Sequence, residues 1–166
     1  VYGQDGVIYS PNKYNFLKNH FIKSKNEIID SEYFNAIASC LAIRNRVFDG
    51  YRFDETLFVD QVDQYFFYQQ RQRHRKFMII DTEINQNFYQ RGAELTPING
   101  WKRVKLRFVD IMRQAKLMGW IKYKLFGFIK CCGLALQISR KTKSVSVLIK
   151  GVFLSVSLLF FLPKTK

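Results

Sequence analysis

Positive charge is concentrated in residues 101–166, and this asymmetry limits what each part of the chain can fold into. Those residues hold fifteen Lys and Arg side chains against one acid, Asp110, whereas residues 1–100 hold twelve basic and twelve acidic side chains. A segment with so many uncompensated cations cannot bury them, so they must face water or an anionic partner. The sequence therefore predicts two parts, a globular domain over 1–100 and a basic tail over 101–166.

Apolar side chains at the start of the tail recur at the spacing of an amphipathic helix. They lie three or four residues apart, at Trp101, Val104, Phe108, Ile111, Ala115 and Met118. Cations fill many of the positions between them, which predicts a helix over 101–118 with a basic polar face, interrupted near Gly119. Residues 120–141 repeat the pattern with more aromatic side chains. Residues 144–163 are nearly all apolar, but Lys150 favours a re-entrant or interfacial segment over a membrane-spanning one.

The first hundred residues have shorter and weaker patterns, which predict a mixed α/β domain. Residues 1–33 show no sustained period and predict a connecting segment with one short strand. The compact apolar stretch 33–45 predicts a buried strand or strand pair, and the β-rich stretch 76–83 predicts a strand. A helical pattern starts at Asp60 and ends in the basic run QQRQRHRK, and residues 84–100 predict a loop.

Four carboxylates surround an apolar LFV in the segment DETLFVDQVD, residues 54–63, namely Asp54, Glu55, Asp60 and Asp63. Asp60 has the position of a helix N-cap, and Asp63 that of the reciprocal acid of a capping box. A carboxylate held rigidly beside apolar side chains can also serve as a general base. Spacing does not decide between these roles, because a cap can also be a base.

Metal and nucleophile sites have little support elsewhere in the chain. The three cysteines Cys40, Cys131 and Cys132 have no C-x-x-C spacing, and the two histidines His20 and His74 are far apart. The sequence therefore predicts neither a zinc site nor a disulfide framework.

Three segments in this order resemble the C-terminal half of family 2 glycosyltransferases, most closely the bacterial rhamnosyltransferase-like branch. They are IASCLAI, FDETLFVDQVDQYFFYQQ and KFMIIDTEINQNFYQRG, and the resemblance covers roughly residues 33–92. It implies an incomplete GT-A fold, a nucleotide-sugar donor and inversion by direct displacement. Its most specific element is FDETLFVDQVD.

The resemblance also assigns roles to particular residues. Asp63 would be the general base that takes the proton of the acceptor hydroxyl, and Asp60 would support it or contact the acceptor. The family's small SGS is matched by Ser39, Cys40 and Leu41, and its later histidine by Gln86. The substrate-binding residues would then be Ser39, Cys40, Asp54, Glu55 and Gln86. Departures from the family at Tyr65 and Gln69 replace its usual acid and arginine.

The donor-binding strands and the metal-binding D-x-D of the family would precede residue 1. Because the chain starts at Val1 rather than at a methionine, it is interpreted as part of a longer protein or as a processed product. A divalent metal, Mg or Mn, is expected only with that missing half, and no metal ligands are predicted within this chain. Asp81-Thr82-Glu83 is interpreted as surface acids. Residues 1–166 alone are therefore expected to show weak or no transferase activity.

The expected partners are a nucleotide-sugar, a glycan or lipid-linked acceptor and the anionic cytoplasmic face of a membrane. Two other classes stay open. A nucleic-acid-binding module would use the interleaved cations and aromatics of residues 101–130, but the long apolar faces of the tail disfavour it. A non-catalytic, membrane-associated remnant would account for the departures at Cys40, Tyr65 and Gln69.

Overall fold

The computed structural model describes residues 1–3, 6–38, 41–59, 61–86, 96–119 and 121–163. The chain divides into two compact units. The sheet unit comprises Val1–Asp54 and Val62–Gly92, and the helical unit comprises Glu55–Gln61 and Ala93–Lys166. The mixed α/β class predicted from the sequence is confirmed.

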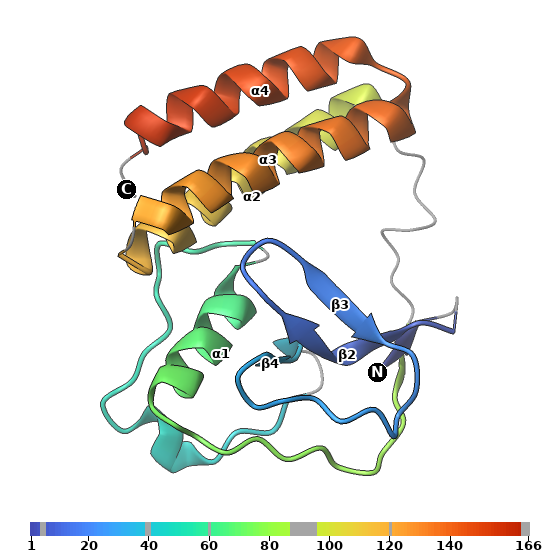
Figure 1. Cartoon of the computed structure of the whole chain (residues 1–166), viewed down its shortest axis with the longest axis vertical. Helices are drawn as coiled ribbons and strands as arrows, with labels where there is room; N and C mark the ends of the chain where they lie inside the picture. Colours follow the sequence, from blue (N-terminus) through green and yellow to red (C-terminus); the bar gives the residue numbers. More distant parts are fainter. Residues whose placement is uncertain (4–5, 39–40, 60, 87–95, 120, 164–166) are drawn as a thin grey trace. The chain divides into compact units, whose positions relative to one another are not determined.

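Five short strands form the sheet of the first unit (Figure 1). They are β1 (Tyr2–Gly3), β2 (Ile8–Tyr14), β3 (Asn19–Ile22), β4 (Phe34–Asn35) and β5 (Asn85–Gln86). The order is β3-β2-β1-β5, and β4 also pairs with β2. Only β1 and β5 run parallel, with Gly3 opposite Gln86. The sheet therefore joins the start of the chain to the segment that follows α1 (Val62–Gln72).

The prediction of one short strand in residues 1–33 was wrong, because three of the five strands lie there. The longest, β2, contains Pro11 and Asn12, which hide the apolar alternation of a strand. Asn12 is nevertheless buried, since its side-chain amide donates to the Tyr9 carbonyl at 2.8 Å and its oxygen accepts from the Asn35 amide at 3.2 Å. A polar pair that is hydrogen-bonded inside the core cannot be recognised from hydropathy.

The strand predicted within 33–45 was wrong in extent, and the strand predicted over 76–83 was wrong altogether. Among the described residues of the first stretch, only Phe34–Asn35 pairs, and a 3₁₀ turn, Asn45–Phe48, begins at its end. In the second stretch no residue is in a strand, and Met78 is 79% exposed. Apolar runs predict buried strands only where a partner strand is present, and here none pairs with Met78, Ile79 or Ile80.

Aromatic side chains form the core of the sheet unit around α1. Phe66 and Phe67 of the helix pack with Phe34 and Tyr51, and all four are buried. Phe77, beyond the helix, stacks on Phe34 with ring centroids 4.7 Å apart and an interplanar angle of 4°. Aromatic contacts of this kind add to the free energy of burial, so α1 and β4 are held together by more than their short hydrogen-bonded register.

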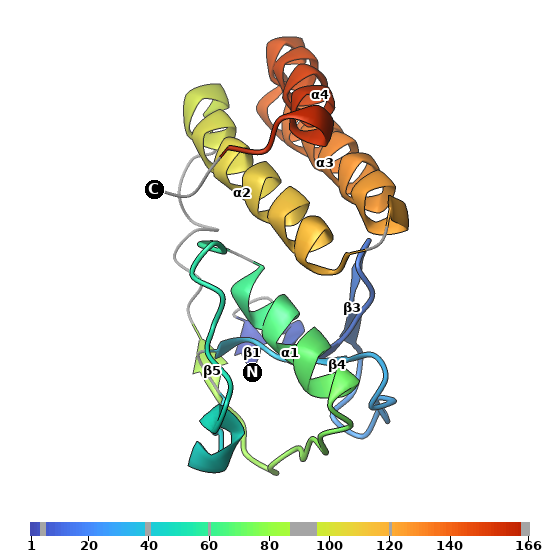
Figure 2. The same cartoon turned by 90° about the vertical axis from the view of Figure 1, so that its left-hand side faces the viewer.

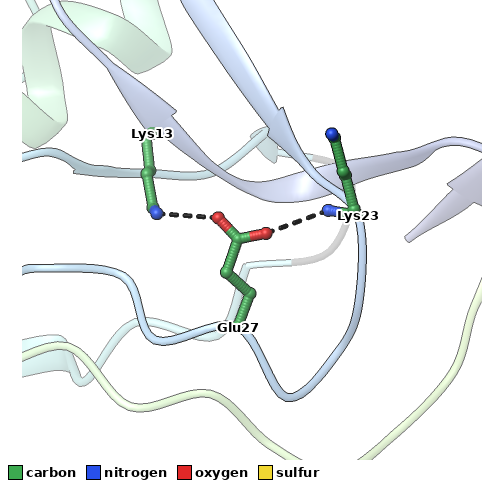
Figure 3. Close-up of polar contacts among 3 residues, drawn as sticks. All are labelled: Lys13, Lys23 and Glu27. Carbon is green, nitrogen blue, oxygen red and sulfur yellow. Dashed lines mark hydrogen bonds and ion pairs between the residues drawn. The ribbon is translucent and has the colours of Figure 1, made fainter.

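A carboxylate fastens the hairpin of β2 and β3 to the loop that follows it. Figure 3 shows Glu27 accepting hydrogen bonds from the Lys13 ammonium at 2.7 Å and from the Lys23 backbone N–H at 3.1 Å. Both bonds lower the pKa of Glu27 from its ordinary value of 4.5, and the bond from Lys13 has the larger effect. The charged form is therefore favoured by folding.

We expect Glu27→Gln to lower the melting temperature of the sheet unit at neutral pH and to have no effect in acid. A carboxyl whose pKa is lowered by folding contributes stability above its unfolded pKa near 4.5, and this contribution disappears as the pH falls through the lower folded value. Melting followed by the near-ultraviolet circular dichroism of the tyrosines, from pH 7 to pH 2, measures the difference. Melting temperatures that differ equally at every pH would contradict this role.

Three helices form the second unit: α2 (Pro97–Leu117), α3 (Ile121–Thr142) and α4 (Val145–Phe160) (Figures 1 and 2). The predicted helices of the tail are confirmed, although α2 starts at Pro97 rather than at Trp101. The Thr96 hydroxyl accepts from the Asn99 N–H at 3.2 Å, and Pro97 occupies the first turn, so this start is a regular N-cap. Among the described residues, no helix combines the length and the apolar composition needed to cross a bilayer.

Small side chains form the contact between α3 and α4. The buried positions of α3 are Gly127, Cys131, Ala135 and Ser139, each four residues after the last. On α4 the buried positions include Gly151 and Ser155. A methyl group added at Gly151 would lie 2.5 Å from the Ala135 Cβ, so the two backbones approach as closely as small residues allow.

Candidate functional site

The acidic segment 54–63 is shared between the two units. Asp54 ends one part of the sheet unit, residues 55–61 belong to the helical unit, and Asp63 lies in the first turn of α1. Three of the predicted site residues, Ser39, Cys40 and Asp60, lie outside the described residues. α1 begins at Val62, so Asp63 is the second residue of the helix and not the third, the capping-box position predicted for it.

Asp63 joins two segments that are distant in sequence. Its Oδ2 accepts a hydrogen bond from the Ala38 backbone N–H at 3.1 Å, and the side chain is partly exposed. An acid in the first turn is also favoured by the positive end of the helix dipole. The carboxylate is therefore fixed by the residue that directly precedes Ser39 and Cys40, while part of its surface stays accessible to a ligand.

Two tyrosines that the sequence did not single out for binding lie near Asp54. Burial, and then the charge of Asp54, raise the pKa of Tyr65. Burial is also the main cause that raises the pKa of Tyr51 to about 12, with Tyr65 and Asp54 adding to it. Both phenols therefore remain neutral hydrogen-bond donors at physiological pH. The sequence signal for this cluster was Tyr65 itself, which the resemblance to glycosyltransferase motifs matches to an acid.

The two remaining predicted site residues are Gln86 and Glu55. Gln86 is on β5, half-buried, in the parallel pair with β1. Glu55 is exposed and belongs to the helical unit. Within the sheet unit, Asp63 is therefore bonded to Ala38, and the charge of Asp54 acts on Tyr65 and Tyr51. A common site for all the predicted residues stays a prediction.

Asp110, the single acid of the tail, holds part of the acidic segment on α2. Its side chain is 1% exposed, and its carboxylate accepts hydrogen bonds from the backbone N–H groups of Phe58, at 3.1 Å to each oxygen, and of Val59. One turn later, the Arg113 guanidinium donates to the Thr56 carbonyl at 2.8 Å. These bonds fix residues 56–59 within the helical unit. Sequence reasoning missed this role, and the one available signal was that Asp110 is the single acid of residues 101–166.

Metal binding and cysteine chemistry have no geometric support in the described part of the chain. In that part, no three His, Cys, Asp or Glu side chains are grouped so as to hold a metal ion. Burial is the main cause that raises the pKa of the Cys131 thiol to about 12, so it stays protonated and unreactive. The divalent metal expected with a donor-binding half stays a prediction.

The described residues thus define a mixed α/β protein with an aromatic-rich sheet unit and a basic three-helix unit. No protein-family model matches its sequence, and no curated protein or solved structure matches the chain. The GT-A fold is accordingly a proposal that depends on the resemblance of the motifs.

Proposed function

We propose that the chain is the acceptor side of an inverting, family 2-like glycosyltransferase. It would help to transfer a sugar, with rhamnose a candidate, from a nucleotide-sugar to a glycan or lipid-linked acceptor in bacterial surface polysaccharide synthesis. The observation that supports this proposal best is the hydrogen bond between Ala38 and Asp63. It joins the two segments that the resemblance brings together, the small-residue segment and the start of the helix with the base.

Asp63 would act as the general base in this reaction. A sugar hydroxyl is a poor nucleophile, and a fixed carboxylate within hydrogen-bond reach removes its proton as the oxygen attacks the anomeric carbon. The nucleoside diphosphate leaves from the opposite face. Asp54, with the neutral phenols of Tyr65 and Tyr51, would bind acceptor hydroxyl groups. A divalent metal bound with the donor would neutralise the charge that develops on the leaving diphosphate.

The helical unit would hold this enzyme on the cytoplasmic face of the cell membrane, peripherally or as a re-entrant segment. Large apolar side chains are exposed along one side of α4, at Val145, Ile149, Val152, Phe153, Val156 and Phe160. Exposed cations lie on α3, at Lys122 and Lys124, and on α4 itself, at Lys150. Apolar side chains enter the interface while cations bind anionic headgroups, so this combination suits an anionic bilayer.

We expect Phe153→Ser to weaken binding to anionic vesicles about tenfold, because Phe153 is 73% exposed and its ring would be transferred from the lipid interface to water. Flotation with vesicles that contain or lack anionic lipid measures the effect. Met78→Ser is the matched control, since Met78 is 79% exposed but belongs to the sheet unit. Equal effects of the two substitutions would contradict the proposed surface.

A nucleic-acid-binding module is the second candidate function, supported by the cations and aromatic rings of α2 and the first half of α3. A nucleic-acid duplex would neutralise these cations but would leave the apolar side chains of α4 exposed to water. An anionic membrane would neutralise the cations and also bury the apolar side chains. Salt-dependent titration with single- and double-stranded oligonucleotides, beside the flotation assay, separates the two. Binding to RNA or DNA without binding to lipid would support the nucleic-acid function and overturn the membrane proposal.

A further inference from the structure

A cavity of about 530 Å³ lies at the C-terminal end of α1, within the sheet unit. Cationic and hydrogen-bonding side chains dominate its lining, which includes Glu32, Arg71, His74, Arg75, Lys76 and Phe77. At neutral pH this lining carries three permanent positive charges against one negative charge. Ligand cavities for small molecules have volumes of roughly 300–1,000 Å³, so the space exceeds what an inorganic anion needs.

The C-terminal end of α1 is capped by backbone hydrogen bonds, so the cations near it are not needed to cap the helix. His74 has a left-handed backbone, with φ of 52°. Its N–H donates to the Arg71 carbonyl at 2.9 Å, and the Arg75 N–H donates to the Gln70 carbonyl at 3.0 Å. This is the Schellman arrangement, which satisfies the last carbonyl groups with backbone donors. Glycine is the favoured residue at the left-handed position, so a histidine there keeps its side chain at a cost in stability.

Two lining residues are held in place by the core. The Arg71 guanidinium donates to the Phe34 carbonyl at 2.6 Å, which fixes the orientation of its planar group. The Phe77 ring stacks on Phe34 and packs against Phe67, with centroids 5.5 Å apart in the second pair. The cavity thus combines an oriented guanidinium with an aromatic wall.

We propose that this cavity binds a phosphate ester with a ring-sized organic part, such as a sugar phosphate. Arg71, Arg75 and Lys76 would contact the phosphate oxygens, and His74 would add an N–H donor. The Glu32 carboxylate would accept from a hydroxyl group of the sugar, and Phe77 would contact its ring. The proposal is independent of the role of Asp63. A soluble metabolite and the headgroup of a phospholipid or glycolipid share this chemistry.

Calorimetric titration of the whole chain with glucose 1-phosphate at low salt tests the site. We expect Arg75→Gln to weaken binding about tenfold, through loss of a charge-assisted hydrogen bond. Arg73→Gln is the matched control, because it removes the same charge two residues away. Arg73 is not among the cavity residues and lies over the Tyr51 ring, 5.3 Å from its centroid. Equal weakening by both substitutions, or no binding of the sugar phosphate or of lipid phosphate, would overturn the proposal.

A second variant separates binding from folding. We expect His74→Gly to raise the melting temperature, because it relieves the left-handed backbone, and at the same time to weaken binding of glucose 1-phosphate severalfold. Unchanged binding would overturn the role of His74. Glucose, which lacks the phosphate, should not bind. Flotation with vesicles of phosphatidic acid distinguishes a lipid headgroup from a soluble metabolite as the ligand. If Arg75→Gln weakens only binding to these vesicles, the ligand is a lipid headgroup. If it weakens only binding of glucose 1-phosphate, the ligand is a soluble metabolite.

Discussion

Under the proposed transferase function, Asp63→Asn is expected to lower turnover by about 10²–10⁴-fold when this chain is joined to a donor-binding half. An amide cannot take the proton of the acceptor hydroxyl. It retains an oxygen that accepts the Ala38 N–H, so the local fold should persist. Release of nucleoside diphosphate from a set of nucleotide-sugars, with isolated membranes as the source of acceptor, measures the rate. Most of the loss should appear in kcat rather than in KM.

Asp49→Asn provides the matched control for this experiment. It removes the same charge from an exposed position in the same unit, at the end of the Asn45–Phe48 turn. If both variants retain full turnover, Asp63 is only a helix-cap residue, whose loss costs about 1 kcal/mol of stability. If the unaltered joined enzyme shows no turnover, the transferase proposal fails and the non-catalytic, membrane-associated reading is favoured.

The helices of the chain were predictable because their signals are local. The three- and four-residue spacing of Val104, Phe108 and Ile111 is a property of one segment, and these side chains are buried as that spacing requires. The Thr96-Pro97 start is also a local signal, although the prediction began at Trp101. The helix α4 covers most of residues 144–163, but its geometry does not test whether this segment lies at a membrane interface or re-enters the membrane.

The strands were not predictable because their determinants are not local. Burial of Asn12 depends on Asn35, which is distant in sequence and belongs to another strand. The exposed run at Met78, Ile79 and Ile80 has the same composition as a buried strand but finds no partner strand. Register in a sheet is set by such pairings, so a single sequence gives it only weakly.

The candidate site was predictable only in part, for the same reason. The position of Asp63 at a helix start follows from its own segment, but its bond to Ala38 depends on the folded chain. Tyr51 and Tyr65 lie near Asp54, and the Asp110 carboxylate accepts hydrogen bonds from Phe58 and Val59. Both arrangements bring together separate segments, whereas a hydropathy pattern describes each segment by itself. The residue types were thus visible in the sequence, whereas their partners were not.

Gly151→Ala is expected to destabilise the helical unit by about 2 kcal/mol, against the usual preference for alanine in helices. The added methyl would lie 2.5 Å from the Ala135 Cβ and 3.5 Å from its Cα, so α3 and α4 would have to separate. Gly133→Ala, in α3, is the matched control. No atom lies within 4 Å of the methyl that it adds, so it should stabilise the unit by about 0.5–1 kcal/mol.

Exchange of the two small residues tests this contact most directly. In the double variant Gly151→Ala/Ala135→Gly the methyl group moves from α3 to α4, so the close approach becomes possible again. Most of the lost stability should then return, apart from the helix propensity of each residue. Urea unfolding followed by tryptophan fluorescence reports this unit, because both tryptophans of the chain, Trp101 and Trp120, belong to it. Additive effects of the two substitutions would show that the contact does not hold α3 and α4 together, since only residues that share a contact deviate from additivity.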